Sequence, residues 1–89
     1  MKTVTETNRF SRDFKRSIRR GKDPEKLFAA LDLLAAGEEL PDRMRPHKLS
    51  GQLEGLWECH IEPDWLLIYQ TDETQVILYR TGTHSDLFR

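Results

Sequence analysis

The spacing of apolar residues changes at Gly55, and this change most constrains what the chain can fold into. Before Gly55, apolar residues recur every three or four positions, as in helices; after it, they alternate with polar residues, as in strands. With 89 residues, the chain can build one modest core, because typical domains span about 50–250 residues. The sequence therefore predicts one domain over residues 1–89, with helices packed on a sheet.

The first half of the chain predicts two consecutive helices. The first is expected to begin at Asn8, a capping residue, and to end at Gly21. The second is expected to begin at Asp23–Pro24, a cap followed by a first-turn proline, and to end at Ala36. The apolar stripes of these helices are Phe10, Phe14 and Ile18 in the first and Leu27, Leu31 and Leu34 in the second.

Four segments have the composition and alternation of strands. Residues 2–7 suit an edge strand, and residues 57–62, 65–69 and 76–79 follow as three more, whereas residues 37–52 are expected to be mostly loop. The predicted order is β-αα-βββ, an α+β fold with a small, antiparallel-rich sheet and the helical hairpin on one of its faces. The other face is expected to be open and is where a site could lie.

Charge is divided unevenly along the chain. Residues 1–50 carry 12 Lys and Arg against 8 Asp and Glu, whereas residues 51–89 carry 2 against 7. The basic excess falls within residues 1–22, so this end of the molecule could hold a polyanion.

Compartment and membrane association follow from the single cysteine and the N-terminal residues. Cys59 is the only cysteine, so neither an intramolecular disulfide nor a thiolate metal cluster can form. The first residues lack the apolar segment of a signal peptide, and no apolar run approaches the ~20 residues of a membrane span. A cytoplasmic protein without membrane contact is therefore expected.

Three histidines and one aspartate are the strongest candidates for chemistry. His60 alternates with the apolar residues of its strand and should point to the open face, and Asp64 lies in the turn that follows. His47 precedes the same strand, and His84 follows the last one. A zinc site is disfavoured because the histidine spacings match no zinc motif. Cys59 alternates inward, so a buried, inert thiol is expected there.

Histidine and aspartate without a metal or cofactor suit cleavage of RNA. The 2′-hydroxyl is a nucleophile within the substrate; one group must take its proton and another must protonate the leaving 5′-oxygen. Histidine can do either at neutral pH. Arg80 or Lys48 could stabilise charge on the phosphate, although an ion pair with the acidic C-terminal half is the alternative for Arg80.

Two long motifs and one short motif resemble a known family. Residues 60–69 read HIEPDWLLIY, residues 79–88 read YRTGTHSDLF, and residues 46–51 read PHKLSG. These segments resemble the YafQ branch of the RelE/ParE toxin superfamily, and the resemblance covers essentially the whole chain. It implies a RelE-like fold and the toxin of a type II toxin–antitoxin pair.

The resemblance also implies an activity, partners and site residues. Such toxins enter the ribosomal A site and cut translated mRNA without a metal, leaving a 2′,3′-cyclic phosphate and a 5′-hydroxyl. A cognate antitoxin blocks the toxin, and the complex binds operator DNA through the antitoxin. By the resemblance, the catalytic positions are His47, His60, Asp64 and His84. Phe88 matches a substrate-stacking aromatic residue, and Trp65 is a further candidate contact for which core packing is at least as good an interpretation.

Within this set, we expect His60 and His84 to transfer the protons, with the acid and base roles left open. Two alternatives remain: a non-catalytic gyrase inhibitor like the ParE branch, and a degenerate toxin that acts only as an antitoxin-binding co-repressor. The histidines argue against a pure binder, which needs no titratable groups there. The basic residues 9–22 could contact ribosomal RNA or an acidic segment of the antitoxin.

Overall fold

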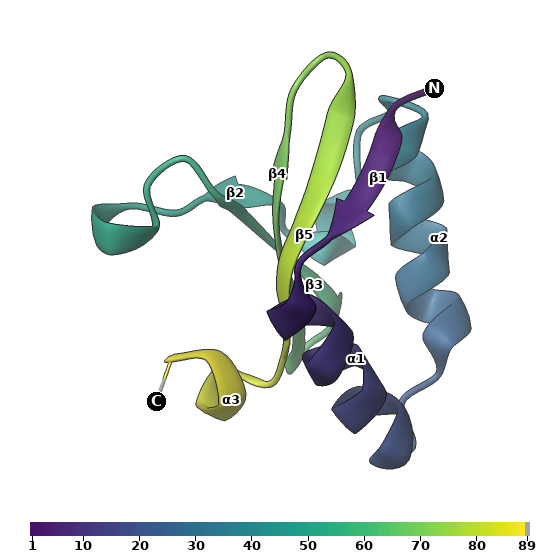
Figure 1. Ribbon diagram of the computed structural model, residues 1–89, viewed down its shortest axis with the longest axis vertical. Coiled ribbons are helices and arrows are strands. Elements are labelled where there is room, and N and C mark those ends of the chain that lie inside the picture. The colour runs from purple at the N-terminus through teal and green to yellow at the C-terminus, as the bar shows by residue number, and fades with distance from the viewer. Residues whose placement is uncertain (89) are drawn as a thin grey trace.

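The computed structural model describes residues 1–88 and confirms the α+β architecture. A five-stranded sheet has the order β1-β5-β4-β3-β2, in which only the β1–β5 pair is parallel (Figure 1). The strands are β1 (Thr3–Glu6), β2 (His47–Lys48), β3 (Trp57–Glu62), β4 (Trp65–Thr71) and β5 (Gln75–Gly82). The helices are α1 (Asn8–Arg19), α2 (Pro24–Ala35) and α3 (His84–Phe88), with 3-10 turns η1 (Asp42–Met44) and η2 (Gly51–Leu53).

Local sequence fixes where both helices of the hairpin begin and where the first one ends. Thr7, and not the expected Asn8, caps α1, because its Oγ1 accepts the Phe10 backbone N–H at 3.1 Å. Asp23 caps α2 as expected, with Pro24 in the first turn. Gly21 has φ of 91°, a left-handed conformation that ends the first helix.

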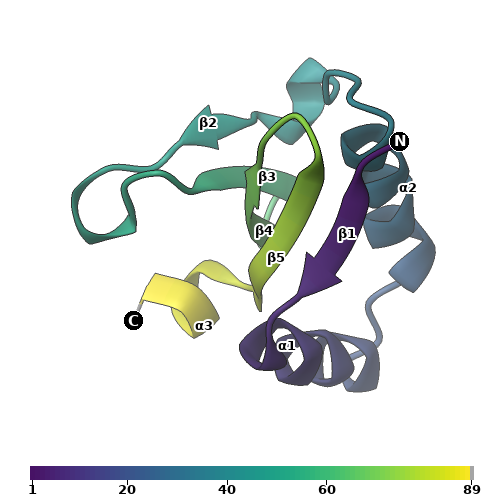
Figure 2. The ribbon, with the colours of Figure 1, turned by 45° about the horizontal axis from the view of Figure 1, so that its top comes forward.

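The main core lies between the sheet and the hairpin. Side chains from α1 and α2 pack there against inward-facing residues of the three central strands, and both helices lie on the same side of the sheet (Figure 2). Asp13 of α1 is also buried, and its carboxylate accepts the Thr81 backbone N–H of β5. The fully or nearly fully buried apolar residues of this core include Phe10, Leu27, Ala30, Cys59, Trp65, Leu67, Val76 and Leu78.

The opposite face of the sheet is less open than the alternation predicts. Glu58, His60, Leu66 and Ile68 point to it, and each is at most 8% exposed. The segment around β2 and η2 and the short helix α3 lie on this side of the sheet (Figure 1). These elements turn the expected open face into a partly covered one.

Strand β2 and two irregularities were not expected from the sequence. The predicted loop at residues 37–52 contains β2, which pairs with β3 and makes the sheet five-stranded. The register also shifts between His60 and Glu62 of β3, and between Ile68 and Tyr69 of β4. Such bulges redirect side chains locally, and the first one adjoins a candidate catalytic histidine. Within residues 1–88, no helix has both the length and the apolar character needed to cross a membrane.

Candidate active site

His84 and Asp64 form the most tightly connected pair of the predicted site. Asp64 lies in the turn between β3 and β4, and its Oδ1 accepts the His84 backbone N–H at 2.9 Å and Nδ1 at 2.7 Å. These hydrogen bonds, from the backbone first and the ring second, lower the pKa of Asp64, so the carboxylate is charged at neutral pH. The contact fixes the proton of His84 on Nδ1 and leaves Nε2 available to a ligand.

His60 lies beside this pair on β3. The ring centroids of His60 and His84 are 5.8 Å apart, with the rings tilted by 47°. Nδ1 of His60 lies 3.1 Å from the Pro63 carbonyl oxygen. Because a carbonyl only accepts, Nδ1 carries the proton and Nε2 of the neutral ring is the proton acceptor. Both histidines therefore carry a proton on Nδ1, and each can accept a proton at Nε2 or donate one from it when doubly protonated.

Glu58 joins the remaining histidine to the site and was missed by the sequence analysis. It is 6% exposed, and its Oε1 lies 3.3 Å from Nε2 of His47 and 3.9 Å from Nε2 of His60. His47 and Glu58 are direct cross-strand partners between β2 and β3. Strand alternation could have indicated Glu58, because a residue two positions before His60 lies on the same face of the sheet.

Phe88 extends the row of rings beyond His84. It lies one turn further along α3, its ring centroid is 6.5 Å from that of His84, and it is 46% exposed. An exposed aromatic ring beside a candidate proton donor is suited to stack on a base. The structure thus brings together His47, His60, Asp64, His84 and Phe88, as expected.

Trp65 does not belong to this surface, which corrects its assignment as a candidate substrate contact. It is 1% exposed, and its Nε1–H donates to Thr81 Oγ1 at 2.9 Å inside the core. Packing, the alternative reading of the sequence, is what the structure shows. Cys59 is also fully buried, and burial raises the pKa of its thiol to about 12, as expected for an inert cysteine.

The two candidate cations lie in different surroundings. Lys48 is exposed on β2, with Nζ 5.6 Å from the Trp57 ring centroid. Arg80 is held by Asp13, to which Nε donates at 2.6 Å and Nη2 at 3.3 Å. The ion-pair alternative for Arg80 is therefore correct, but the carboxylate comes from α1 and not from the C-terminal half. Contact of either cation with phosphate stays a prediction.

The assembled side chains define a class of site. A carboxylate-bound histidine, a second histidine with a lone pair and an exposed aromatic ring suit proton transfer on a substrate with a planar base. Among the described residues, no group of three or more His, Cys, Asp and Glu side chains is arranged to hold a metal ion. The fold and site are those of a small α+β protein suited to acid–base chemistry.

Comparison with known proteins assigns the family. The family model described as "Bacterial toxin of type II toxin-antitoxin system, YafQ" matches residues 2–89. This chain belongs to that family, which confirms the resemblance seen in its motifs. The mRNA interferase toxin YafQ of Escherichia coli K12 is 37% identical over 83 residues, covering 92% of this chain and 90% of that protein.

Two solved structures show the same fold. The toxin chain of the E. coli DinJ–YafQ complex superposes with a TM-score of 0.92 at 34% identity, covering 100% of both chains. A metal-bound toxin from Helicobacter pylori superposes with a TM-score of 0.92 at 36% identity, covering 99% of this chain and all of the other.

Proposed function

We propose that this chain is an mRNA endoribonuclease that cuts on the ribosome and is the toxin of a type II toxin–antitoxin pair. The observation that carries the proposal is the His60–His84 pair, with ring centroids 5.8 Å apart and His84 bonded to Asp64. Family membership and a relative named as an mRNA interferase support it. The proposed active unit is the single domain of residues 1–89, acting in the cytoplasm.

The proposed reaction uses the 2′-hydroxyl of the RNA as nucleophile. Nε2 of His60 takes the 2′-hydroxyl proton as the oxygen attacks phosphorus, and the bond from phosphorus to the 5′-oxygen breaks. Nε2 of His84 gives a proton to that leaving oxygen, and Asp64 stabilises the charged ring before the transfer. The products are a 2′,3′-cyclic phosphate and a 5′-hydroxyl. Each positioned proton transfer contributes roughly 10²–10⁴-fold.

The remaining site residues have supporting roles in this mechanism. Glu58 and His47 orient His60. Oε1 of Glu58 lies 3.3 Å from Nε2 of His47 and 3.9 Å from Nε2 of His60. Phe88 stacks on a base, which is worth ~1–3 kcal/mol. Lys48 and Arg80 supply positive charge near the phosphates, which is most effective where water is excluded.

The proposed partners are an antitoxin, the ribosomal A site with its mRNA, and operator DNA reached through the antitoxin. A relative crystallised as the DinJ–YafQ complex supports the antitoxin. A surface concavity lined by five arginines around Asp13 supports contact with ribosomal RNA, because a local excess of cations suffices to bind phosphates. Its arginines are Arg9, Arg12, Arg16 and Arg19 of α1 and Arg80 of β5.

The test is 5′-end mapping of a translated mRNA incubated with the protein, with and without ribosomes. We expect cuts at fixed codon positions that require ribosomes, and a loss of at least about 10²-fold in rate for His84→Ala. The variant should keep its circular dichroism spectrum and its antitoxin binding, because His84 is exposed. Full activity of His84→Ala would exclude the assigned proton donor.

Two further results would change the proposal. No cutting by a folded wild-type protein would favour the gyrase-inhibitor or co-repressor alternatives. Metal independence is checked with EDTA at levels that leave the Mg²⁺ of the ribosomes in place, where cutting should persist. Loss of cutting that zinc or copper restores would replace the metal-independent mechanism.

A further inference from the structure

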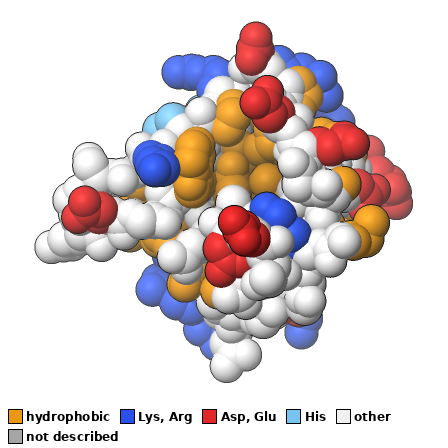
Figure 3. Space-filling model, turned by 90° about the horizontal axis from the view of Figure 1, so that it is seen from above, with side chains coloured by type: hydrophobic (Ala, Val, Ile, Leu, Met, Phe, Trp, Pro, Cys, Tyr) orange, Lys and Arg blue, Asp and Glu red, His pale blue; other side chains and the backbone are white. Residues whose placement is uncertain are grey.

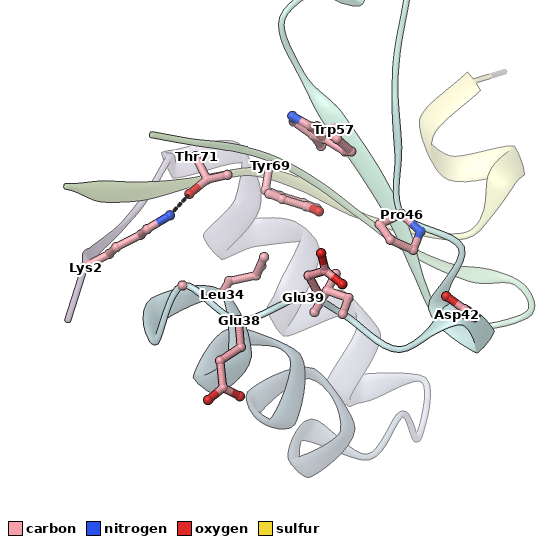
Figure 4. Close-up of a pocket in the computed structure, with 11 residues that line it drawn as sticks. Lys2, Leu34, Glu38, Glu39, Asp42, Pro46, Trp57, Tyr69 and Thr71 are labelled. Carbon is pink, nitrogen blue, oxygen red and sulfur yellow. Dashed lines mark hydrogen bonds between the residues drawn. The ribbon is translucent and has the colours of Figure 1, made fainter. Parts of the chain in front are cut away.

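A pocket lies on the helix-covered face of the sheet, where the helices leave one end of that face uncovered. It has a volume of about 410 Å³, within the range of about 300–1,000 Å³ typical of ligand-binding pockets. Trp57 and Tyr69 contribute from β3 and β4, and Leu34 from the last turns of α2 (Figure 4). None of the candidate catalytic residues lines it.

The floor of the pocket is apolar and its rim is charged. Leu34, Leu40, Pro46 and Trp57 provide apolar surface. Figure 3 looks onto this end of the molecule and shows hydrophobic side chains gathered in a hollow, with acidic and basic side chains around it. An exposed apolar hollow with a polar rim is typical of an interaction site.

Tyr69 provides a hydrogen-bond donor inside the pocket. The residue is 3% exposed, and its hydroxyl points into the pocket (Figure 4). The other tyrosine, Tyr79, bonds to Gln70 Oε1 at 3.2 Å, whereas the Tyr69 hydroxyl has no hydrogen-bond partner among residues 1–88. Burial raises the pKa of Tyr69, so the group stays protonated and can donate. Among residues 1–88, Arg16 Nε is the one fully buried side-chain polar atom without a hydrogen bond, so the Tyr69 hydroxyl keeps contact with solvent and is free to donate to an acceptor that enters the pocket.

The rim charge indicates the chemistry of the occupant. Glu38, Glu39 and Asp42 line the pocket, and none of them forms an ion pair within residues 1–88. Lys2 lies beside Gly37, the residue before Glu38, and is engaged by Thr71, with Nζ donating to Oγ1 at 3.1 Å. Three carboxylates without partners beside an apolar floor match an apolar side chain that has Lys or Arg next to it.

We propose that this pocket anchors the antitoxin, through an apolar side chain of the antitoxin flanked by a basic one. The apolar side chain fills the space between Trp57 and Leu34, a backbone carbonyl accepts the Tyr69 hydroxyl, and the basic side chain pairs with Glu38 and Glu39. None of the candidate catalytic residues lines the anchor, which adjoins their surface through Pro46, next to His47, and Trp57, whose ring centroid lies 5.6 Å from Lys48 Nζ. The inference deepens the antitoxin partnership and is independent of RNA cutting.

The test uses the two tryptophans as a matched pair in ¹H–¹⁵N spectra of the toxin with His84→Ala, titrated with the antitoxin encoded in the same operon. The indole N–H of Trp57 should shift on binding. That of Trp65 should stay in place, because it is buried and bonded to Thr81. A Trp57 signal unchanged in a saturated complex would overturn the anchor while leaving the toxin–antitoxin pairing intact.

Calorimetric titration of the same pair supplies the second readout. Glu38→Gln with Glu39→Gln should raise the Kd by about three- to tenfold, and less at high salt. Tyr69→Phe should raise it by about two- to tenfold, because it removes one hydrogen bond at nearly constant volume. Glu54→Gln, an exposed change in the segment around η2 on the other side of the sheet, is the control and should leave the Kd unchanged.

Two outcomes would overturn the proposed antitoxin anchor. Unchanged Kd values for all pocket variants would exclude the anchor. A Trp57 shift that depends on toxin concentration in the absence of antitoxin would assign the pocket to a second copy of this chain and would also overturn the proposal. Failure of the wild-type toxin to bind at all would remove the antitoxin partnership itself, whereas RNA cutting is decided separately by the end-mapping assay.

Discussion

Trp65 and Asp64 are adjacent in the chain but have opposite environments. The Asp64 side chain is 63% exposed and holds His84, whereas Trp65 is 1% exposed and belongs to the core. Asp64 lies in the turn and Trp65 begins the buried strand β4, so a motif that runs through both mixes a site residue with a packing residue. The family motif alone does not separate the two roles, and burial does.

Trp65→Phe tests this separation. The change removes the hydrogen bond to Thr81 and leaves a small cavity, so we expect a loss of about 1–3 kcal/mol in the free energy of unfolding. Urea unfolding followed by circular dichroism measures it. The cutting rate per folded molecule should remain unchanged, and a folded variant that has lost its activity would restore Trp65 as a substrate contact.

Glu58→Gln tests the residue that the sequence analysis missed. The amide nearly preserves shape, but the charge beside His47 and His60 is lost, so the ribosome-dependent cutting rate should fall by roughly ten- to hundredfold. End mapping and thermal unfolding should be measured together, with Glu54→Gln as the exposed control. An unchanged cutting rate would mean that Glu58 is only a buried structural carboxylate.

At the scale of elements, α3 depends on α1 for its position. Asp86 of α3 lies 2.8 Å from Nη1 of Arg20 and 3.6 Å from Nη2 of Arg16, and it also accepts the Thr83 backbone N–H at 2.9 Å. Partial burial works against the charge of Asp86, but the Thr83 hydrogen bond and the two arginines outweigh it and lower its pKa. This contact holds the helix that carries His84 and Phe88.

Asp86→Asn tests whether the ion pairs of Asp86 with Arg16 and Arg20 position His84. Asparagine keeps an acceptor for the Thr83 N–H but loses the attraction to the arginines, so the cutting rate at saturating ribosomes should fall by roughly three- to tenfold. The free energy of unfolding should change by less than about 1 kcal/mol, because Arg20 is largely exposed.

A matched control for this tie lies on the same helix. Lys15→Ala removes an exposed cation that forms no ion pair within residues 1–88 and lies outside the arginine-lined concavity, so it should leave the position of α3 unchanged. Equal losses at saturating ribosomes for Lys15→Ala and Asp86→Asn would indicate a general charge effect and not positioning of α3.

Most elements could be predicted from the sequence, and the shortest strand could not. Helices α1 and α2 follow from apolar residues that recur every three or four positions, β1 and β3 from alternation, and β4 and β5 from runs of apolar, strand-forming residues. Strand β2 has two residues, too few for any period, and forms because β3 offers it an edge. The bulges at His60 and Ile68 likewise arise from pairing between strands, which local propensity does not contain.

At the scale of the whole molecule, stability should fall in acid. The pKa values of Glu62, Asp64, Asp72 and Asp86 are all lowered by hydrogen bonds or nearby cations. A lowered pKa in the folded state means that the unfolded chain binds more protons, so stability rises with pH through that window. The contribution is complete above the ordinary values of 3.8 for Asp and 4.5 for Glu and is lost as pH falls below them.

The measurement is the urea midpoint of unfolding at several values between pH 6 and pH 2.5. We expect a steady decline below about pH 4.5, with a shallower slope for Glu62→Gln, whose carboxylate otherwise bonds Lys22 and Lys26 at 2.8 Å each. A midpoint that stays constant down to pH 3 would contradict the role of these four carboxylates.

The site is a property of the whole fold, which explains how much of it the sequence could indicate. Its residues come from β2, β3, the β3–β4 turn and α3, and family motifs marked most of them. No local pattern gives the distances between them, because those distances depend on the bulge at His60, on the β2–β3 pairing and on the tie between α1 and α3. Glu58 lies outside the quoted family motifs, and Asp86 lies within the last one but was not singled out as a site residue.

The parallel β1–β5 pair has a kinetic consequence. It aligns Thr3 with Gln75 and Glu6 with Leu78, so the edge of the sheet closes only when the two ends of the chain meet. Contacts between residues so distant in sequence slow folding, because the chain entropy is lost before the contacts form. The helical hairpin can therefore form early, whereas the sheet edge and the α3 that follows β5 form late. A newly synthesised chain should therefore become toxic only after β5 has paired with β1.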